Sequence, residues 1–327
     1  MPKPIIFSGI QPTGNLHIGN YLGAVKNWVD LQNSGKYICY FFIADYHSLT
    51  GDMSATMRRD QILRTATELL ALGIDPQKST LFVQSHVPEH TELAWIFNTV
   101  TPVAELERMT QFKDKSERQE QNINTGLFTY PILQVADVLL YRCTLVPVGQ
   151  DQVQHIELAR TIARLFNKRY GEYFPETKPL LTEIPKVMSL LEPDKKMSKS
   201  KGPNHIIELA DEPDVIYKKL AKAVTATEGG GHAPGVENLL LLLKHFGDKN
   251  RYEDFVLAEK KKTIRYADLK EAVAEAISVC FADFRIRRET LLQNPGHLSD
   301  ILIAGAEKAR GVAARTMEDV RRLVGVR

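Results

Sequence analysis

The sequence predicts an α/β protein, with a doubly wound parallel sheet followed by an all-helical C-terminal region. Up to about residue 190, short apolar runs typical of buried strands alternate with stretches of helical spacing. From Asp211 onward the strand pattern stops and apolar residues recur at helical intervals. The 327 residues are enough for two domains. We expect an N-terminal domain over 1–190 and a C-terminal domain over 191–327.

Five apolar runs predict the strands, and the segments between them predict the covering helices. The expected strands are Ile5–Phe7, Tyr37–Ala44, Thr80–Gln84, Leu145–Val148 and Ile184–Leu190. Helices are expected over 20–31, 54–72, 93–100 and 129–140, the last with Pro131 in its first turn, and another follows Gly149. A long connecting insertion, about 102–128, contains a polar, charged stretch. The C-terminal helices are expected at 211–224, 236–246, 250–260, 265–293 and 299–324, and the last of these can pack back on the first domain.

Composition narrows the class of protein. The net charge of +2 gives no global signal for nucleic acid, so any RNA contact must come from local patches. Cys39, Cys143 and Cys280 lie far apart in apolar surroundings and form no C-x-x-C motif, so we expect buried thiols and no structural metal. The N-terminus carries no signal peptide, and no apolar run reaches membrane-spanning length. These features predict a cytoplasmic protein without a membrane partner.

A glycine-rich turn, Ser8–Asn20, connects the first strand to the first helix. Few side chains obstruct its backbone, and the helix that follows directs unpaired N–H groups and a positive dipole end toward the turn. The arrangement suits an anion such as phosphate. An ordinary tight bend between strand and helix explains the glycines equally well.

Three further features mark candidate binding residues. Tyr130, Gln134 and Asp137 lie on one face of an otherwise apolar helix, which indicates either a structural hydrogen-bond network or a pocket for a small polar-aromatic ligand. His47 follows a buried strand, where ligands bind in open α/β sheets, but a structural histidine also fits. Asp151 can serve as a helix N-cap or hold a ribose hydroxyl.

Two short motifs make the resemblance to a known class specific. His17–Asn20 (HIGN) resembles the HIGH signature of class I aminoacyl-tRNA synthetases, and Lys196–Ser200 matches their KMSKS signature at every position. Longer segments are similar to bacterial tryptophanyl-tRNA synthetases in order and spacing. They are Phe7–Gly23, Glu107–Phe112, Tyr130–Asp137, Val146–Gly149 with Asp151, Gln152 and His155, and Lys196–Ser200.

The resemblance implies a Rossmann-like nucleotide-binding domain of the HUP type and a role for each matching residue. It assigns to ATP binding Gln11, Pro12, Thr13, His17, Gly19, Asn20, Gly149, Gln150, Asp151, Val187, Lys196, Met197, Ser198, Lys199 and Ser200. The residues it assigns to tryptophan are Phe7, Gly9, His47, Tyr130, Gln134, Asp137 and Gln152, with Asp137 accepting the indole N–H. Catalysis of adenylate formation is assigned to Gln11, His17, Lys115, Lys196 and Lys199.

The same resemblance implies the partners: ATP with its bound Mg²⁺, L-tryptophan, tRNA(Trp), and a second copy of the chain in a homodimer. The helical region would bind the anticodon end of the RNA. Gln134 and Gln150 depart from the family's commoner methionine and glutamate, and Gln134 near Asp137 also resembles tyrosyl-tRNA synthetases. Two alternatives are a small-molecule adenylyl- or cytidylyltransferase, against which the full KMSKS match argues, and a non-catalytic RNA-binding relative, against which the intact Lys196, Lys199 and Asp137 argue.

Overall fold

The computed structural model describes residues 3–109, 124–149, 153–181, 185–225 and 233–326. The chain divides into two compact units. Unit 1 comprises Met1–Thr13, Asn27–Glu183 and Asn294–Arg327, and unit 2 comprises Gly14–Lys26 and Ile184–Gln293. Each unit is described by itself. The functional boundary expected near residue 190 stays a prediction.

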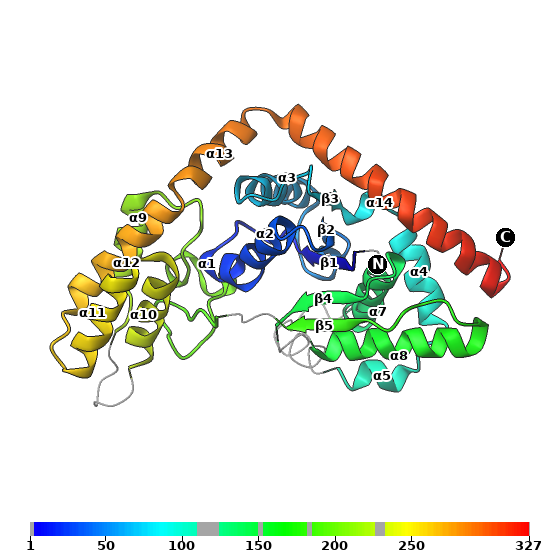
Figure 1. Ribbon diagram of the computed structural model, residues 1–327, viewed down its shortest axis with the longest axis horizontal. Helices are drawn as coiled ribbons and strands as arrows, with labels where there is room; N and C mark the ends of the chain where they lie inside the picture. Colours follow the sequence, from blue (N-terminus) through cyan, green and yellow to red (C-terminus); the bar gives the residue numbers. More distant parts are fainter. Residues whose placement is uncertain (1–2, 110–123, 150–152, 182–184, 226–232, 327) are drawn as a thin grey trace. The chain divides into compact units, whose positions relative to one another are not determined.

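Unit 1 is built on a five-stranded parallel sheet, which confirms the predicted fold class (Figure 1). The strands are β1 (Ile5–Ile10), β2 (Ile38–Ile43), β3 (Ser79–Val83), β4 (Leu145–Val148) and β5 (Lys178–Leu181), in the order β3-β2-β1-β4-β5. The chain runs outward from β1 through β2 to β3 and then returns to the other side of β1. That reversal is the kind of switch point at which open α/β sheets bind ligands.

Helices cover both faces of the sheet. Successive side chains of a strand point to opposite faces, so a strand that is apolar throughout has to be covered on both. On β2, Phe41 stacks on Trp28 of one helix, with ring centroids 4.9 Å apart, whereas Tyr40 faces Tyr141 at 5.0 Å. The helices of unit 1 are α2 (Lys26–Asn33), α3 (Ala55–Ala71), α4 (Glu89–Asn98), α5 (Val103–Glu107), α7 (Thr125–Leu140), α8 (Val153–Tyr170) and α14 (Pro295–Val324).

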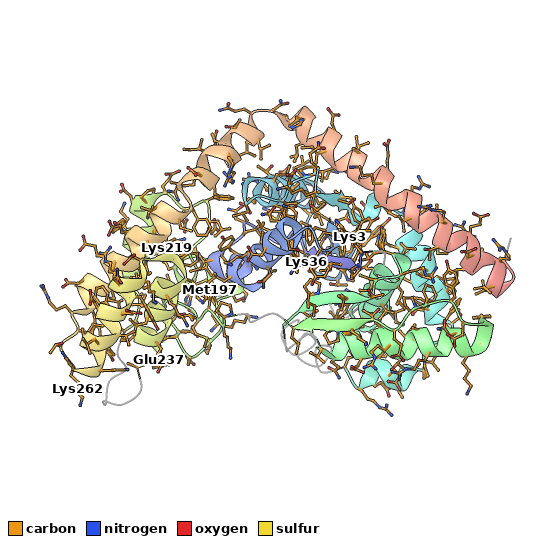
Figure 2. All side chains as sticks on the ribbon, in the orientation of Figure 1. Lys3, Lys36, Met197, Lys219, Glu237 and Lys262 are labelled. Atoms are coloured by element: carbon orange, nitrogen blue, oxygen red, sulfur yellow. The ribbon has the colours of Figure 1, made fainter. Side chains whose placement is uncertain are left out.

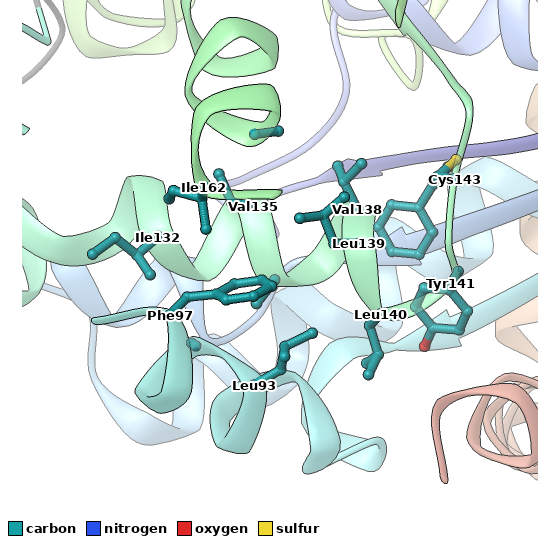
Figure 3. Close-up of a cluster of buried hydrophobic side chains, with 14 of the residues drawn as sticks. Leu93, Phe97, Ile132, Val135, Val138, Leu139, Leu140, Tyr141, Cys143 and Ile162 are labelled. Atoms are coloured by element: carbon teal, nitrogen blue, oxygen red, sulfur yellow. The ribbon is translucent and has the colours of Figure 1, made fainter. Parts of the chain in front are cut away.

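The main core of unit 1 surrounds α7. Figure 3 shows Ile132, Val135 and Leu139 of α7 together with Leu93 and Phe97 of α4. All five side chains are buried. Because this helix is apolar almost throughout, a polar residue on it must find partners inside the protein.

The structure corrects several sequence-based predictions. Residues 185–190 form no strand: Met188 makes an isolated bridge with Lys196, and the fifth strand is instead Lys178–Leu181, which lies at the sheet edge, where its proline is tolerated. Helix α7 begins four residues earlier than expected, at Thr125, so Pro131 lies inside the helix and not in its first turn. Cys39 and Cys143 are buried, but Cys280 is exposed because it ends a helix on the outward face.

Unit 2 is helical. It contains α1 (Ile18–Asn20), a π-helical turn (Tyr21–Val25), α9 (Pro213–Ala221), α10 (Pro234–Phe246), α11 (Lys249–Lys260), α12 (Tyr266–Cys280) and α13 (Ala282–Leu292). Figure 2 labels Lys219 of α9, which pairs with Asp211 at 2.6 Å. The single helix predicted over 265–293 is divided at Phe281, whose buried ring packs edge-on against Tyr21 with centroids 5.0 Å apart.

The last helix, α14, belongs to unit 1 and packs against β3 and α4. Arg310 Nε pairs with Glu89 Oε1 at 3.0 Å, and Arg321 Nη2 with Glu92 Oε2 at 2.5 Å. None of the described helices combines the length and the apolar character needed to cross a membrane.

Candidate active site

The first candidate site, in unit 1, is the carboxylate of Asp137 in the fourth turn of α7. Asn124 starts this helix because its side-chain oxygen accepts the N–H of Leu127 at 3.0 Å. The Asp137 side chain is 1% exposed. A charge so deeply buried must be balanced by donors from neighbouring elements.

Three side chains from three different elements supply those donors. His47 Nε2, after β2, lies 2.7 Å from Asp137 Oδ2. Gln84 Nε2, directly after β3, donates to Oδ1 at 2.7 Å, and His90 Nδ1, in the first turn of α4, lies 2.6 Å from the same oxygen. The carboxyl ends of two neighbouring parallel strands thus converge on one carboxylate, as expected for a ligand site in this sheet type.

The contacts keep Asp137 ionised. Burial by itself would raise the pKa of its carboxyl, but the electrostatic attraction of His47 and its hydrogen bond, and then the hydrogen bond and attraction of His90, outweigh burial and lower the pKa from 3.8 to about 2. At neutral pH the group is therefore an acceptor only.

His90 is held in turn by Tyr141, at the end of α7. The His90 Nε2 and the Tyr141 hydroxyl oxygen are 3.0 Å apart, and both residues are completely buried. Burial, reinforced by the negative charge of Asp137, raises the pKa of the Tyr141 phenol well above 10, so it stays protonated.

Sequence reasoning singled out Asp137 and His47 but missed Gln84, His90 and Tyr141. Gln84 had a signal similar to that of His47, since it is the last residue of a predicted strand. His90 and Tyr141 had none: they are 47 and 51 residues from their partners, and only the packing of α4 against α7 joins them.

The other residues expected to bind the amino acid differ in their burial and in their contacts. Tyr130 is buried, with its ring edge-on to His47 at 6.3 Å, and burial raises its pKa to about 12. Gln134 is half-buried and is not one of the hydrogen-bond donors to Asp137. Phe7 is wholly buried and stacks on Tyr141 with centroids 4.8 Å apart. At Gly9, an added Cβ would lie 2.2 Å from the Phe42 ring, so only glycine allows this ring to pack directly against the backbone of β1.

The second candidate site is the glycine-rich turn after β1. Thr13 N donates to Gln11 O at 2.9 Å, Pro12 is buried, and Gly14 has φ +100°, a conformation that favours glycine. Lys199 Nζ donates to Gly14 O at 2.8 Å, which brings the HIGH-like and KMSKS segments together within unit 2.

His17 is the N-cap of α1. Its Nδ1 accepts the N–H of Gly19 at 3.1 Å, while the His17 N–H donates to Asn20 Oδ1 at 3.1 Å, forming a reciprocal capping box. Burial, and then the charges of Lys199 and Lys196, lower the pKa of His17 from 6.5 to about 4. The ring is therefore neutral at pH 7, and because Nδ1 accepts, its proton resides on Nε2.

Backbone pairing fixes the KMSKS segment. Met197 N donates to Val187 O at 3.0 Å, and Ser189 N donates to Lys195 O at 2.8 Å. Val187 and Met197 are buried, whereas Ser198 and Ser200 lie near the surface with their hydroxyl oxygens 3.0 Å apart. The segment 206–209 pairs with the HIGH-like turn, because Ile18 N donates to Ile207 O and Leu209 N donates to Leu16 O.

Some expected residues lie outside the described part of the chain: Lys115, Gln150, Asp151 and Gln152. Their neighbour Gly149 is described and is buried directly after β4. Among the described residues, no group of three or more His, Cys, Asp or Glu side chains is arranged to hold a metal ion.

The two candidate sites, each described by itself, differ in their chemistry. The turn and the KMSKS segment combine helix N–H groups, a neutral histidine and the ammonium groups of Lys196 and Lys199, which suits the phosphates of a nucleotide. The buried carboxylate of Asp137 suits a small ligand that offers an N–H or O–H donor.

Comparison with known proteins agrees with this chemistry. A family model described as tRNA synthetases class I (W and Y) matches residues 2–282. The tryptophan–tRNA ligase of Wolinella succinogenes is 44% identical, with 100% of both chains covered, and tryptophan–tRNA ligase 2 of Streptomyces avermitilis is 46% identical over 99% of this chain and 97% of that one. The crystal structure of Campylobacter jejuni tryptophanyl-tRNA synthetase with ADP and tryptophan is 35% identical, with a TM-score of 0.86, covering 98% of this chain and 100% of that one. With a family match over most of its length, the chain belongs to the class I tRNA synthetases of the tryptophan and tyrosine group.

Proposed function

We propose that this protein is a tryptophan–tRNA ligase, which activates L-tryptophan with ATP to tryptophanyl-adenylate and transfers it to the 3′ end of tRNA(Trp). The relatives of matching length that carry this name support the proposal. The single structural observation that carries it is the ionised, buried carboxylate of Asp137, held at the end of two parallel strands.

Asp137 selects the amino acid by matching donor and acceptor. The indole N–H is a donor only, and the Asp137 carboxylate is an acceptor only, so the two fit without ambiguity. Tyr130 and His47 shape the space beside the carboxylate, and Phe7 supports it from the core. Gly9, Gln134 and Gln152 complete the proposed set.

The HIGH-like turn and the KMSKS segment bind ATP in this proposal. Lys196 and Lys199 neutralise the phosphates, and the Nε2–H of His17 donates to a phosphate oxygen, since Nδ1 is engaged with Gly19. The adenosine contacts Val187, Met197 and the backbone at Gly149. Ser198 and Ser200 belong to the same ATP-binding set. Gln11, Pro12, Thr13, Gly19 and Asn20 line the turn. Lys115, Gln150 and Asp151 have their proposed roles from resemblance alone.

Adenylate formation then needs no protein nucleophile. The tryptophan carboxylate attacks the α-phosphate in line and pyrophosphate leaves, so the protein contributes positioning and charge stabilisation. The cationic residues of the site fit a nucleotide that arrives with Mg²⁺ on its own phosphate oxygens. When bound, Mg²⁺ neutralises the charge that develops on the leaving pyrophosphate. Lysine is suited to follow that charge because its ammonium group is mobile.

The remaining partners follow from family membership. We propose a cytoplasmic homodimer in which the helices of unit 2 contact the anticodon end of the RNA. A ribose hydroxyl at the 3′ end of tRNA(Trp) attacks the adenylate in the second step.

Amino-acid-dependent ATP–pyrophosphate exchange across the twenty amino acids tests the proposal. We expect exchange with tryptophan and at least ~10³-fold less with tyrosine or phenylalanine, because a site built to hydrogen-bond one group rejects analogues that lack or misplace it. Comparable exchange with tyrosine would instead assign the chain to the tyrosine branch. If none of the twenty amino acids supported exchange, the result would favour a non-catalytic RNA-binding protein.

A further inference from the structure

We propose that His90 and Tyr141 are positioning residues that fix which oxygen of Asp137 accepts the ring N–H of the substrate, and so set the preference for a side chain with that N–H. The inference rests on the proposed function and deepens it. All of its residues belong to unit 1. The sequence analysis assigned Asp137 and His47 to tryptophan binding but gave no role to His90 or Tyr141.

His90 lies in a closed aromatic chamber. Its ring centroid is 6.3 Å from that of Phe7, 6.2 Å from Phe42, 6.0 Å from Phe82 and 5.5 Å from Tyr141. Its side chain is 0% exposed. Water is therefore kept from both ring nitrogens, and each must be satisfied by a protein group.

The neighbours of His90 determine its tautomer. The Asp137 carboxylate can only accept, so His90 Nδ1, 2.6 Å away, carries a hydrogen. We assign the acceptor role to Nε2, to which the Tyr141 hydroxyl, 3.0 Å away, donates. The relay runs from the Tyr141 hydroxyl through His90 to Asp137 Oδ1.

The relay leaves one oxygen of Asp137 open to substrate. Each carboxylate oxygen has about two acceptor positions. Gln84 and His90 occupy both positions on Oδ1, whereas in the described part of the chain Oδ2 receives only His47. One acceptor position thus stays on Oδ2. Without the Tyr141 hydroxyl, the His90 ring can exchange tautomers and release Oδ1, and the carboxylate can rotate away from its accepting orientation.

Tyr141→Phe tests the relay, with Tyr40→Phe as its matched control. Both changes remove one buried phenol oxygen from the same core, where the rings are 5.0 Å apart, but Tyr40 has no hydrogen bond to His90 or Asp137. Each variant is assayed by ATP–pyrophosphate exchange with tryptophan and with 3-benzothienylalanine, in which sulfur replaces the ring N–H. The measured quantity is the ratio of the two kcat/KM values.

For Tyr141→Phe we expect the KM for tryptophan to rise ~10-fold, the KM for ATP and kcat to stay within about twofold, and the preference for tryptophan over the sulfur analogue to fall ~10-fold. Tyr40→Phe should keep the wild-type ratio. A hydroxyl that merely fills the core would lower thermal stability in both variants without changing the ratio.

A second pair of variants makes the test independent of the tyrosine. His90→Asn keeps a donor for Oδ1, because the amide nitrogen of Asn occupies the place of Nδ1, whereas His90→Leu removes it. The Asn variant should retain more of the preference than the Leu variant. Equal ratios in the two, or an unchanged ratio in Tyr141→Phe, would overturn the relay while tryptophan-dependent exchange still supported the proposed function. Wild-type exchange with tyrosine alone would overturn both.

Discussion

His17 is neutral and Asp137 is negatively charged because their surroundings differ. Both side chains are buried, and burial favours the neutral form of each. Asp137 overcomes this with three donors and stays charged, whereas His17 has two lysines nearby, which also disfavour a positive charge. The result is an anionic acceptor in unit 1 and a neutral donor in the cationic part of unit 2.

The neutral state of His17 predicts a pH dependence of stability. Its pKa is about 4 in the folded protein against 6.5 ordinarily, so the unfolded chain takes up the proton first as pH falls. This contribution is complete above pH 6.5 and is lost as pH falls toward 4. Denaturant titrations at several pH values should show the free energy of unfolding falling by ~1–3 kcal/mol more in wild type than in His17→Asn, which keeps an N-cap acceptor but does not titrate. Equal slopes for the two proteins would contradict the assignment.

At the scale of elements, α14 is placed by small residues. Gly305 lies against β3 so closely that an added Cβ would be 1.9 Å from the carbonyl oxygen of Leu81. Ala306, Ala309 and Ala313 continue the buried stripe. The ion pairs of Arg310 and Arg321 with α4 then fix the helix along its length.

Two glycines of α14 provide a matched test of that close approach. Gly305→Ala should destabilise unit 1 by ~2 kcal/mol or more, since the helix must move away from the β3 backbone. Gly311→Ala lies in the same helix with nothing within 4 Å of its Cβ, and should instead stabilise by ~0.5–1 kcal/mol through helix propensity. Thermal unfolding of both variants gives the comparison. Stabilisation by Gly305→Ala would show that α14 does not pack this way in solution.

Element boundaries were the less predictable part of the fold. The alternating apolar runs were sufficient for β1 to β4 and for their parallel order. The run 184–190 read as a strand because it is apolar, but its backbone instead pairs with the KMSKS segment and with Asn238, whose side-chain oxygen accepts Met188 N at 2.9 Å. Such pairing depends on residues far along the chain, which no local pattern reveals.

At the scale of the whole molecule, the α11 lysines give a test of RNA binding. Lys260 and Lys261 are exposed at the end of α11. If the helices of unit 2 contact tRNA phosphates, replacing both with alanine should raise the KM for tRNA(Trp) several-fold and reduce its salt dependence, while pyrophosphate exchange without RNA stays unchanged. Lys36→Ala, at an exposed site in unit 1, is the control. An unchanged KM for tRNA in the double variant would place the RNA elsewhere.

The sequence by itself determined the fold class, the two signature segments and the candidates Asp137, His47 and His17, because strand alternation and short motifs are local properties of the chain. Only the tertiary structure joined Gln84, His90 and Tyr141 to Asp137, and Lys199 to Gly14. Only it showed that α14 packs against β3. The physical reason is that a buried charge is satisfied by whichever donors packing brings within about 3 Å, and packing joins residues that have no relation in sequence.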